Sequence, residues 1–430
     1  MKIRLCCLLQ CMWWGAVAVS LATGEPVWSW EDCLHEAALH NPQLAGADAR
    51  LQAAEAGRGV ARSALRPQVG AGAGAERRGV RDNISRTTTE FRTTVGVDQL
   101  LYTGGRLTAG VREASAAKEV SEAMAWGVAA EVTFALRAAF IELLHAQEEQ
   151  QLLEQVEQRR QNNLQLVELL YDGGKEHKGS LAVSAASLFQ ATTDVRLVAR
   201  RIAWARSLLQ RTTGLETIHD DLTVAGELAV LPPPSQVDWH TVVERTPEYA
   251  RAAAERRAGA ARVERARSGR RPDITVSGQA GRFGDHDAFE RDQWQMGVAI
   301  AYPFWPGGRH RHEVAQARYL LNEIEFALVD IRQQVRLLLE ERLHAYRNAI
   351  DHVEVRQRFL DASELRAEIA RQQYTSGLLS FEDWSRIEND LIDNQRLVLS
   401  AMQAAMLAEA RWLRAAGTTA FESITPGDNP

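Results

Sequence analysis

Several short stretches of this chain carry residue types that could do chemistry. Three alternating glycines in 70–74 are a candidate dinucleotide-binding site. They lack the G-x-G-x-x-G spacing, and no predicted helix follows them to bind the phosphates. His310 and His312 stand at a predicted helix start, where side chains two residues apart diverge, and this argues against a metal site. The acidic stretch 284–292 offers oxygen ligands for a cation, but a solvated external loop explains it more simply. With no nucleophile–base pair or paired catalytic acids, the sequence predicts no catalytic residue, metal site or cofactor.

The elements that would position any site are mainly helical. The chain has 430 residues, of which 45% are hydrophobic and only 7% aromatic. Alanine, leucine, glutamate, glutamine and arginine are abundant, and this composition indicates long helices rather than a sheet-rich globule. The formal net charge is −6, which gives no support to a nucleic-acid partner.

Residues 1–22 are typical of an export signal. Lys2 and Arg4 make a basic start, residues 5–19 are apolar apart from one glutamine, and residues 20–22 provide the small residues of a cleavage site. An uncleaved membrane anchor is the alternative. No run of about 18 apolar residues follows, so any further membrane crossing would have to be made without a helix.

Cysteine usage predicts no disulfide framework. Three of the four cysteines lie in the predicted signal, which leaves Cys33 alone. A lipoprotein signal needs a small residue before its cysteine, and Gln10 before Cys11 fits that requirement badly. The sequence leaves lipidation of the N-terminus open.

The chain contains a tandem duplication. Two proline-bounded segments, 42–67 and 247–272, are offset by 247 − 42 = 205 residues and share an Ala-Arg-Ser run in register. Further on the offset becomes 309 − 106 = 203. At this offset a double-glycine junction, a Tyr-x-x-Gly turn and a terminal glycine align, namely Gly104, Tyr171, Gly174 and Gly214 with Gly307, Tyr374, Gly377 and Gly417.

Each copy predicts the same order of elements: a helix of about 25 residues, two strands, a long helix and a return helix. The long proline-free segment has 171 − 106 + 1 = 66 residues, or about 100 Å as one helix, too long for a compact domain. Apolar residues at helical spacing indicate an antiparallel coiled coil. The predicted bounds are 23–214 for the first repeat (strands about 67–77 and 91–101, long helix about 106–171, return helix about 180–212), 215–240 for an equatorial linker, 241–417 for the second repeat (strands about 272–283 and 293–303, long helix about 309–374, return helix about 381–415) and 418–430 for a C-terminal tail.

The strands have the alternation of a membrane β-barrel. In the last one, small or polar residues occupy one face and large apolar residues the other, which are Trp294, Met296, Val298, Ile300 and Tyr302. A pair of ordinary hairpins in a soluble domain is the alternative. Four strands leave two open edges, and an open edge cannot face lipid. If the strands span a membrane, several chains must therefore close one barrel.

These features together resemble the TolC family of outer-membrane efflux channels. The duplicated unit, the "YTGGR" and "PFWPGGR" junctions and "QYTSGLLSFEDW" carry the resemblance over essentially the whole mature chain. It implies a mainly α fold with a small membrane β-barrel: a homotrimer closes a twelve-stranded barrel, and a long α-helical barrel continues it across the periplasm. It also implies two protein partners, a periplasmic adaptor (a membrane fusion protein) and an inner-membrane transporter.

The resemblance assigns the two helical hairpin turns to a periplasmic tip that meets the adaptor. A plain solvated turn is the alternative. Glycine at the centre of each turn supplies permissive backbone. The predicted contact residues are Gly174, Lys175, His177, Lys178, Gly179 and Ser180 in the first turn and Gly377, Leu378, Leu379 and Ser380 in the second.

The resemblance also implies a gate. Aligned on Gly377, Asp383 falls where the family has the first carboxylate of a constricting ring, and Tyr374 where a tyrosine helps to tie the closed tip. The second ring carboxylate would fall at Arg386, a departure that leaves three interpretations open: a weaker gate, a gate of different charge or a gate at another position. Asp383 has a second interpretation, because Ser380 and Asp383 form the S-x-x-D capping pattern of a helix start. The sequence leaves both interpretations open.

The sequence therefore predicts the outer-membrane exit duct of a tripartite efflux or type I secretion system, with gated passive passage and no enzymatic activity. Its barrel would lie in the outer membrane of a Gram-negative-type cell, in contact with lipid, and its helices in the periplasm. The alternative is a soluble periplasmic coiled-coil scaffold or adaptor, which would need a larger β-rich head than these strand pairs provide. Cargo, pump and adaptor are not identified by the sequence.

Overall fold

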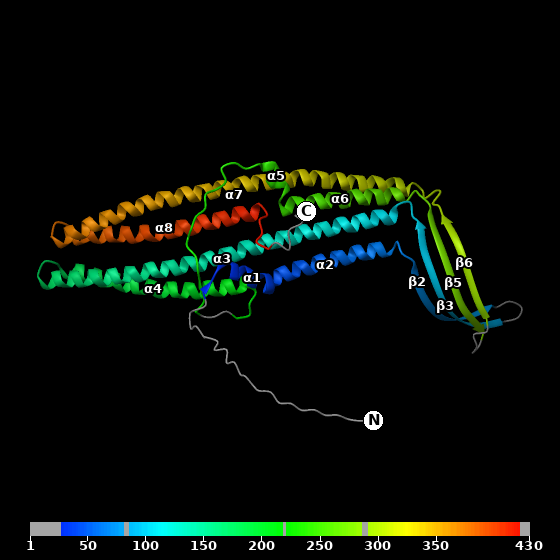
Figure 1. Cartoon of the computed structure of the whole chain (residues 1–430), viewed down its shortest axis with the longest axis horizontal. Coiled ribbons are helices and arrows are strands. Elements are labelled where there is room, and N and C mark those ends of the chain that lie inside the picture. Colours follow the sequence, from blue (N-terminus) through cyan, green and yellow to red (C-terminus); the bar gives the residue numbers. More distant parts are fainter. Residues whose placement is uncertain (1–26, 81–85, 218–220, 286–290, 422–430) are drawn as a thin grey trace, which may run out of the picture.

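The chain is an elongated bundle of long helices that ends in a four-stranded sheet (Figure 1). The computed structural model describes residues 27–80, 86–217, 221–285 and 291–421, so the predicted signal, most of the C-terminal tail and part of the acidic stretch 284–292 lie outside the described residues. In chain order the elements are β1 Val27–Trp28, α1 Trp30–His40, α2 Pro42–Ser63, β2 Gln68–Val80, β3 Arg86–Tyr102, α3 Arg106–Asp172, α4 Lys178–Thr213, β4 Thr223–Val224, α5 Trp239–Glu244, α6 Pro247–Ser268, β5 Asp273–Asp285, β6 Arg291–Ala301, α7 Arg309–Thr375 and α8 Phe381–Ala415.

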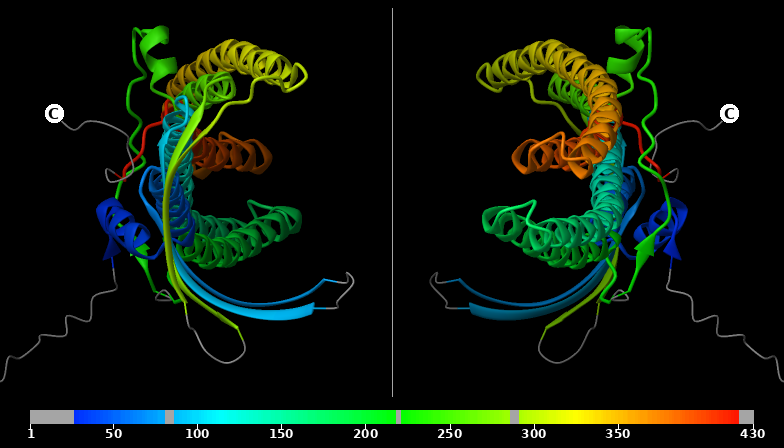
Figure 2. Two further views of the ribbon diagram at one scale, coloured as in Figure 1. Left: turned by 90° about the vertical axis from the view of Figure 1, so that its right-hand side faces the viewer. Right: turned by 90° about the vertical axis from the view of Figure 1, so that its left-hand side faces the viewer.

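The helices are arranged in two halves along the bundle. Away from the sheet, the hairpins α3–α4 and α7–α8 lie side by side, with α3 against α8. Nearer the sheet, α2 packs on α3, and α6 packs between α3 and α7. In the half away from the sheet, α4 and α7 are thus the two edges of the helical layer (Figure 1), and the end views show that this layer is curved (Figure 2).

The two repeats start their helices in the same way. Asn41 and Thr246 cap the N-termini of α2 and α6 with their side-chain oxygens, and a proline fills the first helical position, where no N–H is needed. Both helices have 22 residues, somewhat fewer than the predicted 25. They end at Ser63 and Ser268, shortly before the second proline, which cannot continue a helix.

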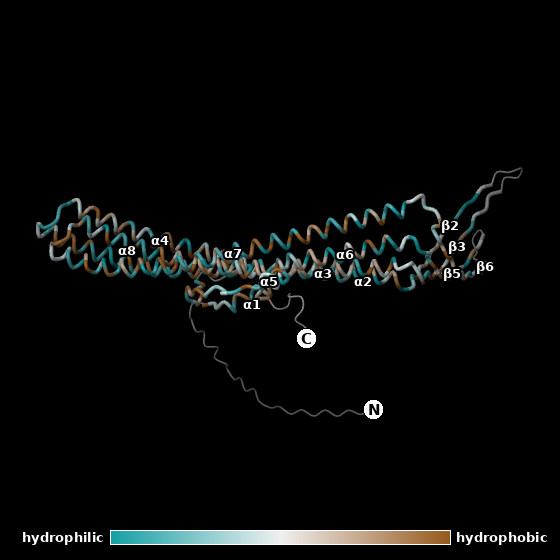
Figure 3. The backbone as a smooth tube through the Cα atoms, turned by 90° about the horizontal axis from the view of Figure 1, so that it is seen from above, coloured by the Kyte–Doolittle hydropathy of each residue, from teal (hydrophilic) through white to brown (hydrophobic). Residues whose placement is uncertain are grey.

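Each long helix buries an apolar stripe against its neighbours, and the two repeats bury equivalent residues. Hydrophobic and hydrophilic positions alternate along the whole bundle (Figure 3). At the offset of 203, four residues of one central cluster correspond to four of the other: Leu136, Phe140, Leu143 and Leu209 in the first repeat and Leu339, Leu343, Tyr346 and Trp412 in the second. The duplication therefore extends to the core. Among the helices of the described residues, none combines the length and the apolar character that crossing a membrane requires.

The four long strands form one antiparallel sheet in the order β2-β3-β5-β6. β3 of the first repeat pairs with β5 of the second, so the sheet joins the two repeats. β2 and β6 each pair on one side only and are the edges of the sheet.

The strand bounds differ from the predicted ones at several ends. β2 and β3 extend further toward the loop that connects them, to Val80 and from Arg86. β6 stops at Ala301, so Tyr302 lies just beyond the strand in which it was expected. Pro303 follows Tyr302, and a proline cannot donate to a strand ladder.

Four short elements lie around the middle of the bundle, on the outer side of the curved helical layer (Figure 2), and the sequence did not predict them. β1 pairs in parallel with β4 inside the predicted linker, with Val27 opposite Thr223. α1 begins with a complete capping box formed by Ser29 and Asp32, and α5 precedes α6. These elements cover the centre of the core, where Trp30 packs edge-on against Phe140 with ring centroids 5.7 Å apart.

Gly214 and Gly417 end the return helices. Each of these glycines lies against the start of its own repeat. Both have positive φ, 85° and 75°. A Cβ on Gly214 would overlap the backbone of His40 and Asn41, and one on Gly417 would lie 2.7 Å from Pro247 Cδ. Only glycine fits these sites.

We expect Gly214→Ala to lower the free energy of unfolding by at least about 1–2 kcal/mol, the cost of left-handed backbone for an L-residue, with the backbone overlap added. Gly57→Ala is the matched control, because Gly57 is an exposed position in α2 where an added methyl group would meet no neighbouring atom within 4 Å. That change should be neutral or stabilising by about 0.5–1 kcal/mol. Denaturant unfolding in detergent compares the two variants, and equal midpoints would contradict the assignment.

Candidate functional site

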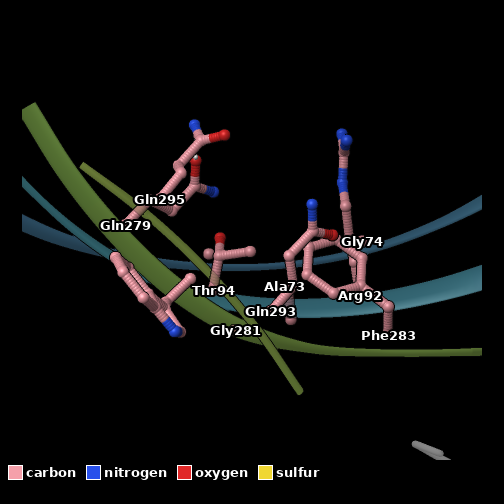
Figure 4. Close-up of a pocket in the computed structure, with 11 residues that line it drawn as sticks. Ala73, Gly74, Arg92, Thr94, Gln279, Gly281, Phe283, Gln293 and Gln295 are labelled. Carbon is pink, nitrogen blue, oxygen red and sulfur yellow. Dashed lines mark hydrogen bonds between the residues drawn. The ribbon is translucent and has the colours of Figure 1, made fainter. Parts of the chain in front are cut away.

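One face of the sheet is polar and small. The register places Gly72, Thr94, Gly281 and Gln293 in one row across the four strands, and Gly70, Gly96, Gln279 and Gln295 in the next. Gln295 Nε2 donates to Gln279 Oε1 at 3.3 Å. Side chains of these rows line a shallow pocket of about 510 Å³ (Figure 4). The alternating glycines of β2 therefore belong to a polar sheet face.

The opposite face of the sheet is apolar and exposed. The rows between the polar ones place Ala71, Val95, Ala280 and Trp294 together, and Val69, Val97, Gly278 and Met296 together. Trp294 and Met296 are each 76% exposed, and Val298 and Ile300 are exposed as well. Exposed apolar residues in this number do not suit a sheet surrounded by water, and they indicate an apolar environment. They include four of the predicted lipid-facing residues, and the fifth, Tyr302, is exposed directly after the strand.

The far end of the bundle carries the two hairpin turns. Gly174 and Gly377 have φ of 71° and 76°, so each turn uses the left-handed backbone that glycine adopts most readily. Lys175, His177 and Leu378 lie in these turns; Lys175 and Leu378 are exposed there, and Leu379 is half-buried.

The first turn is shorter than its sequence indicated. His177 caps α4 by accepting a hydrogen bond from the backbone N–H of Ser180, at 3.2 Å to Nδ1, so Lys178, Gly179 and Ser180 form the first turn of the helix. Ser180 is buried, with 1% of its surface exposed, and does not reach the tip surface of the single chain. Lys178 and Gly179 remain exposed.

Tyr374 joins the two hairpins at the tip. Its ring is buried and stacks on Trp384, with centroids 4.2 Å apart and planes 8° from parallel. Its hydroxyl donates to Glu176 Oε1 of the other hairpin at 3.1 Å. Burial, with a smaller effect from the Glu176 carboxylate, raises the pKa of Tyr374, so the phenol stays protonated and able to donate around neutral pH. Sequence reasoning missed Glu176, because nothing marks it among the many acidic residues of the chain.

Asp383 and Arg386 lie in the first turns of α8, where Asp383 is exposed. Ser380 Oγ accepts from the Asp383 backbone N–H at 3.2 Å and donates to Asp383 Oδ2 at 2.8 Å. The capping contact is therefore present, while the Asp383 carboxylate remains exposed to solvent. Arg386 makes no hydrogen bond or ion pair within the described residues. No ion pair or hydrogen bond joins it to Asp383 within the part of the chain that the structure describes.

A buried polar contact between α3 and α8 was also not predicted. Glu388 and Asn163 are both almost fully buried, and Asn163 Nδ2 donates to Glu388 Oε2 at 3.5 Å. Arg160 Nη2 donates to Asn389 Oδ1 at 2.5 Å beside them. The position of Glu388 on the helix, between the apolar Ile387 and Leu391, was the available signal.

Of the possible metal ligands, His310 is buried and its Nδ1 lies 3.1 Å from Glu313 Oε2, whereas His312 is exposed. Within the described ranges, no three His, Cys, Asp or Glu side chains gather as a metal site would require. The central part of the acidic stretch 284–292 lies outside those ranges.

Comparisons with known proteins cover nearly the whole chain. The sequence profile of the outer membrane efflux protein family matches residues 33–215 and 240–418. No curated protein matches the sequence. Three solved structures share the fold: a membrane protein from Pseudomonas aeruginosa (TM-score 0.80, 17% identity, 90% of this chain and 93% of that one), VceC from Vibrio cholerae (0.76, 19%, 90% and 96%) and the open state of the MtrE channel from Neisseria gonorrhoeae (0.79, 17%, 90% and 88%).

These findings confirm the predicted mainly α-helical fold with a small sheet and the resemblance to outer-membrane efflux channels. The soluble scaffold or adaptor is not favoured, and the family and the structural neighbours are channels rather than enzymes. Because the family match spans both repeats, this chain belongs to the outer membrane efflux protein family.

Proposed function

We propose that three copies of this chain form one channel that serves as the exit duct of a tripartite efflux or type I secretion system. The four strands of each copy contribute to a twelve-stranded barrel in the outer membrane, and the helices continue the duct into the periplasm. Substrate passes through without chemical change, and the energy comes from an inner-membrane transporter.

The observation that carries this proposal is the sheet with two open edges and two unlike faces. β2 and β6 have no partner strand on their outer sides within the described residues. An unpaired backbone edge is costly in lipid, and closure by neighbouring copies removes it. In a closed barrel the polar face, with Thr94, Gln279 and Gln295, lines the lumen, and the apolar face, with Trp294 and Met296, meets lipid.

The periplasmic tip supplies the contact with an adaptor. Lys175 and His177 lie in one turn and Leu378 in the other at the end of the bundle, and Leu378 is 80% exposed. An apolar side chain in one turn and basic side chains in the other suit a protein partner with an apolar tip and acidic flanks.

The test is whether the purified chain assembles and conducts. Detergent-solubilised protein should run as a heat-sensitive trimer, and in a planar bilayer it should form long-lived channels. A chain that stays monomeric and soluble in buffer without detergent would overturn the proposal. Loss of channels in a denatured sample is the control for contaminating pores.

Two substitutions distinguish a gating role of Asp383 from a role as a helix cap only. Asp383→Asn keeps an oxygen that accepts from Ser380 Oγ but removes the charge, whereas Ser380→Ala removes the cap and keeps the carboxylate. If three Asp383 carboxylates surround a narrow pore, the cation preference should fall several-fold in Asp383→Asn and stay unchanged in Ser380→Ala. Reversal potentials in a salt gradient measure this preference. If both variants keep the cation preference of the parent chain, Asp383 is a helix cap only.

A further inference from the structure

The internal duplication predicts that a helix contact found in one repeat has an equivalent in the other. α3 and α7 have the same length and are related by 309 − 106 = 203 residues, and α4 and α8 start 381 − 178 = 203 residues apart. Within the chain, α3 packs against α8 along the half of the bundle away from the sheet. The equivalent contact would join α7 to α4, yet these two helices are the opposite edges of the layer (Figure 1). That contact is therefore open in a single chain.

In the first repeat, the groove between α3 and α4 is filled by α8. Ile392 of α8 is buried in one cluster with Val156 of α3 and Ala191 of α4, each less than 7% exposed. The polar contacts of Arg160 with Asn389 and of Asn163 with Glu388 lie beside this cluster.

In the second repeat, the same groove is open. A pocket of about 370 Å³ lies between α7 and α8. Four of its lining residues are the equivalents, at the offset of 203, of the residues that hold α8 in the first repeat: Phe359 of Val156, Ser363 of Arg160, Arg366 of Asn163 and Asn394 of Ala191. Phe359 is 58% exposed, although its equivalent Val156 is buried.

We infer that α4 of a neighbouring copy fills this groove, with Phe189 as the inserted side chain. Phe189 is the equivalent of Ile392, because 392 − 203 = 189, and it is 70% exposed in the single chain. Ala185 and Ala186 replace Glu388 and Asn389, so the polar side chains of the first contact are absent and the helix backbone can approach closely. Phe189 and Phe359 thus form an aromatic pair in place of the Val156–Ile392 contact.

A second contact along the same seam supports the register independently. Arg137 of α3 forms an ion pair with the buried Glu409 of α8 at 3.2 Å. The equivalents of these two residues are 137 + 203 = 340 and 409 − 203 = 206, which are Glu340 and Arg206. Both charges are exchanged, so the pair remains attractive. Across the boundary between copies, Arg206 of one chain then faces Glu340 of the next.

The inference rests on the proposed oligomer and adds its register, and cysteine cross-linking tests the two separately. We expect the double variant Phe189→Cys/Phe359→Cys to give products of two and three chains with a bismaleimide that spans about 8–10 Å, the usual separation of packed helices. Each single variant should give no cross-linked product. Positions 189 and 359 lie on opposite edges of one copy, so the same position in two neighbouring copies does not meet. Burial raises the pKa of Cys33 to about 12, and the other three cysteines lie in the predicted signal, so a parent chain that lacks residues 1–22 should not react.

The matched control moves one cysteine along the same helix. Phe189→Cys/Tyr319→Cys uses another exposed position on α7, 359 − 319 = 40 residues from the predicted partner, or about 60 Å away. It should not cross-link. A trimer that forms normally but does not link 189 to 359 would overturn the inferred register and leave the proposed function intact. A protein that never assembles would overturn both.

Charge exchange gives a second readout. Arg206→Glu should reduce the trimer fraction at low salt, and adding Glu340→Arg should restore it. Arg206 Nε also donates to Leu222 O within its own chain at 2.7 Å, and the loss of that bond could not be restored by a change at Glu340. Absence of rescue in the double variant, with normal folding by circular dichroism, would contradict the Arg206–Glu340 contact.

Discussion

Val298→Arg should abolish the assembled channel. Val298 is exposed at 67%, lies inside β6 and pairs with Val276 on the apolar face of the sheet. On the lipid face of a membrane barrel an arginine near the midplane costs about 2–4 kcal/mol, and a trimer would carry three of them. Even the lower value exceeds the roughly 1.4 kcal/mol that changes an equilibrium tenfold. The heat-sensitive trimer in outer-membrane fractions, followed by gel mobility, measures the effect.

Gln295→Arg is the matched control for Val298→Arg. Gln295 lies on the same strand and opposite Gln279, on the polar face that we place in the lumen. An arginine there meets water, so assembly should be retained and only ion selectivity should change. In a water-soluble sheet both positions would be exposed alike, and the two arginines would have similar effects. Equal assembly of both variants would therefore show that the apolar face is not in lipid.

The elements with a repeated signal could be predicted from the sequence. Strand β6 alternates from Trp294 to Ile300, and the long helices carry an apolar stripe without proline, so their type and approximate bounds follow from local periodicity. The duplication gave two copies of each element, so an element boundary recognised in one copy could be transferred to the other. The paired core residues Leu136 and Leu339 show how far that correspondence extends.

What the sequence did not predict depends on packing between elements. β1 and β4 have two residues each, too few to show alternation, and exist through their parallel pairing across the chain. The acceptor of the Tyr374 hydroxyl is Glu176 of the other hairpin, and this pairing depends on how the two hairpins pack against each other. Ser180 has the sequence context of a turn residue, but the cap from His177 draws it into a helix and buries it. Local propensity carries no information on such contacts.

Tyr374→Phe should open the periplasmic tip. The substitution removes the hydrogen bond to Glu176 and leaves the stacking on Trp384. A hydrogen bond to a charged group contributes about 1.5–3 kcal/mol, so if the contact breaks on opening, the open population should rise about tenfold or more. Single-channel recording should show higher mean conductance. Tyr374→Ala also removes the stacked ring, and truncation of a buried aromatic costs about 3–5 kcal/mol, so its effect should be larger.

The duplication provides the control for this prediction. Tyr171 is the equivalent of Tyr374 in the first repeat, but the position equivalent to Glu176 is 176 + 203 = 379, which is Leu379, whose side chain cannot accept a hydrogen bond. Tyr171→Phe should therefore leave conductance unchanged. Glu176→Ala removes the acceptor from the other hairpin, and combining it with Tyr374→Phe should add little, because both changes break one bond. Additive effects, or a conductance in Tyr374→Phe equal to that of the parent, would show that this hydrogen bond does not hold the tip closed.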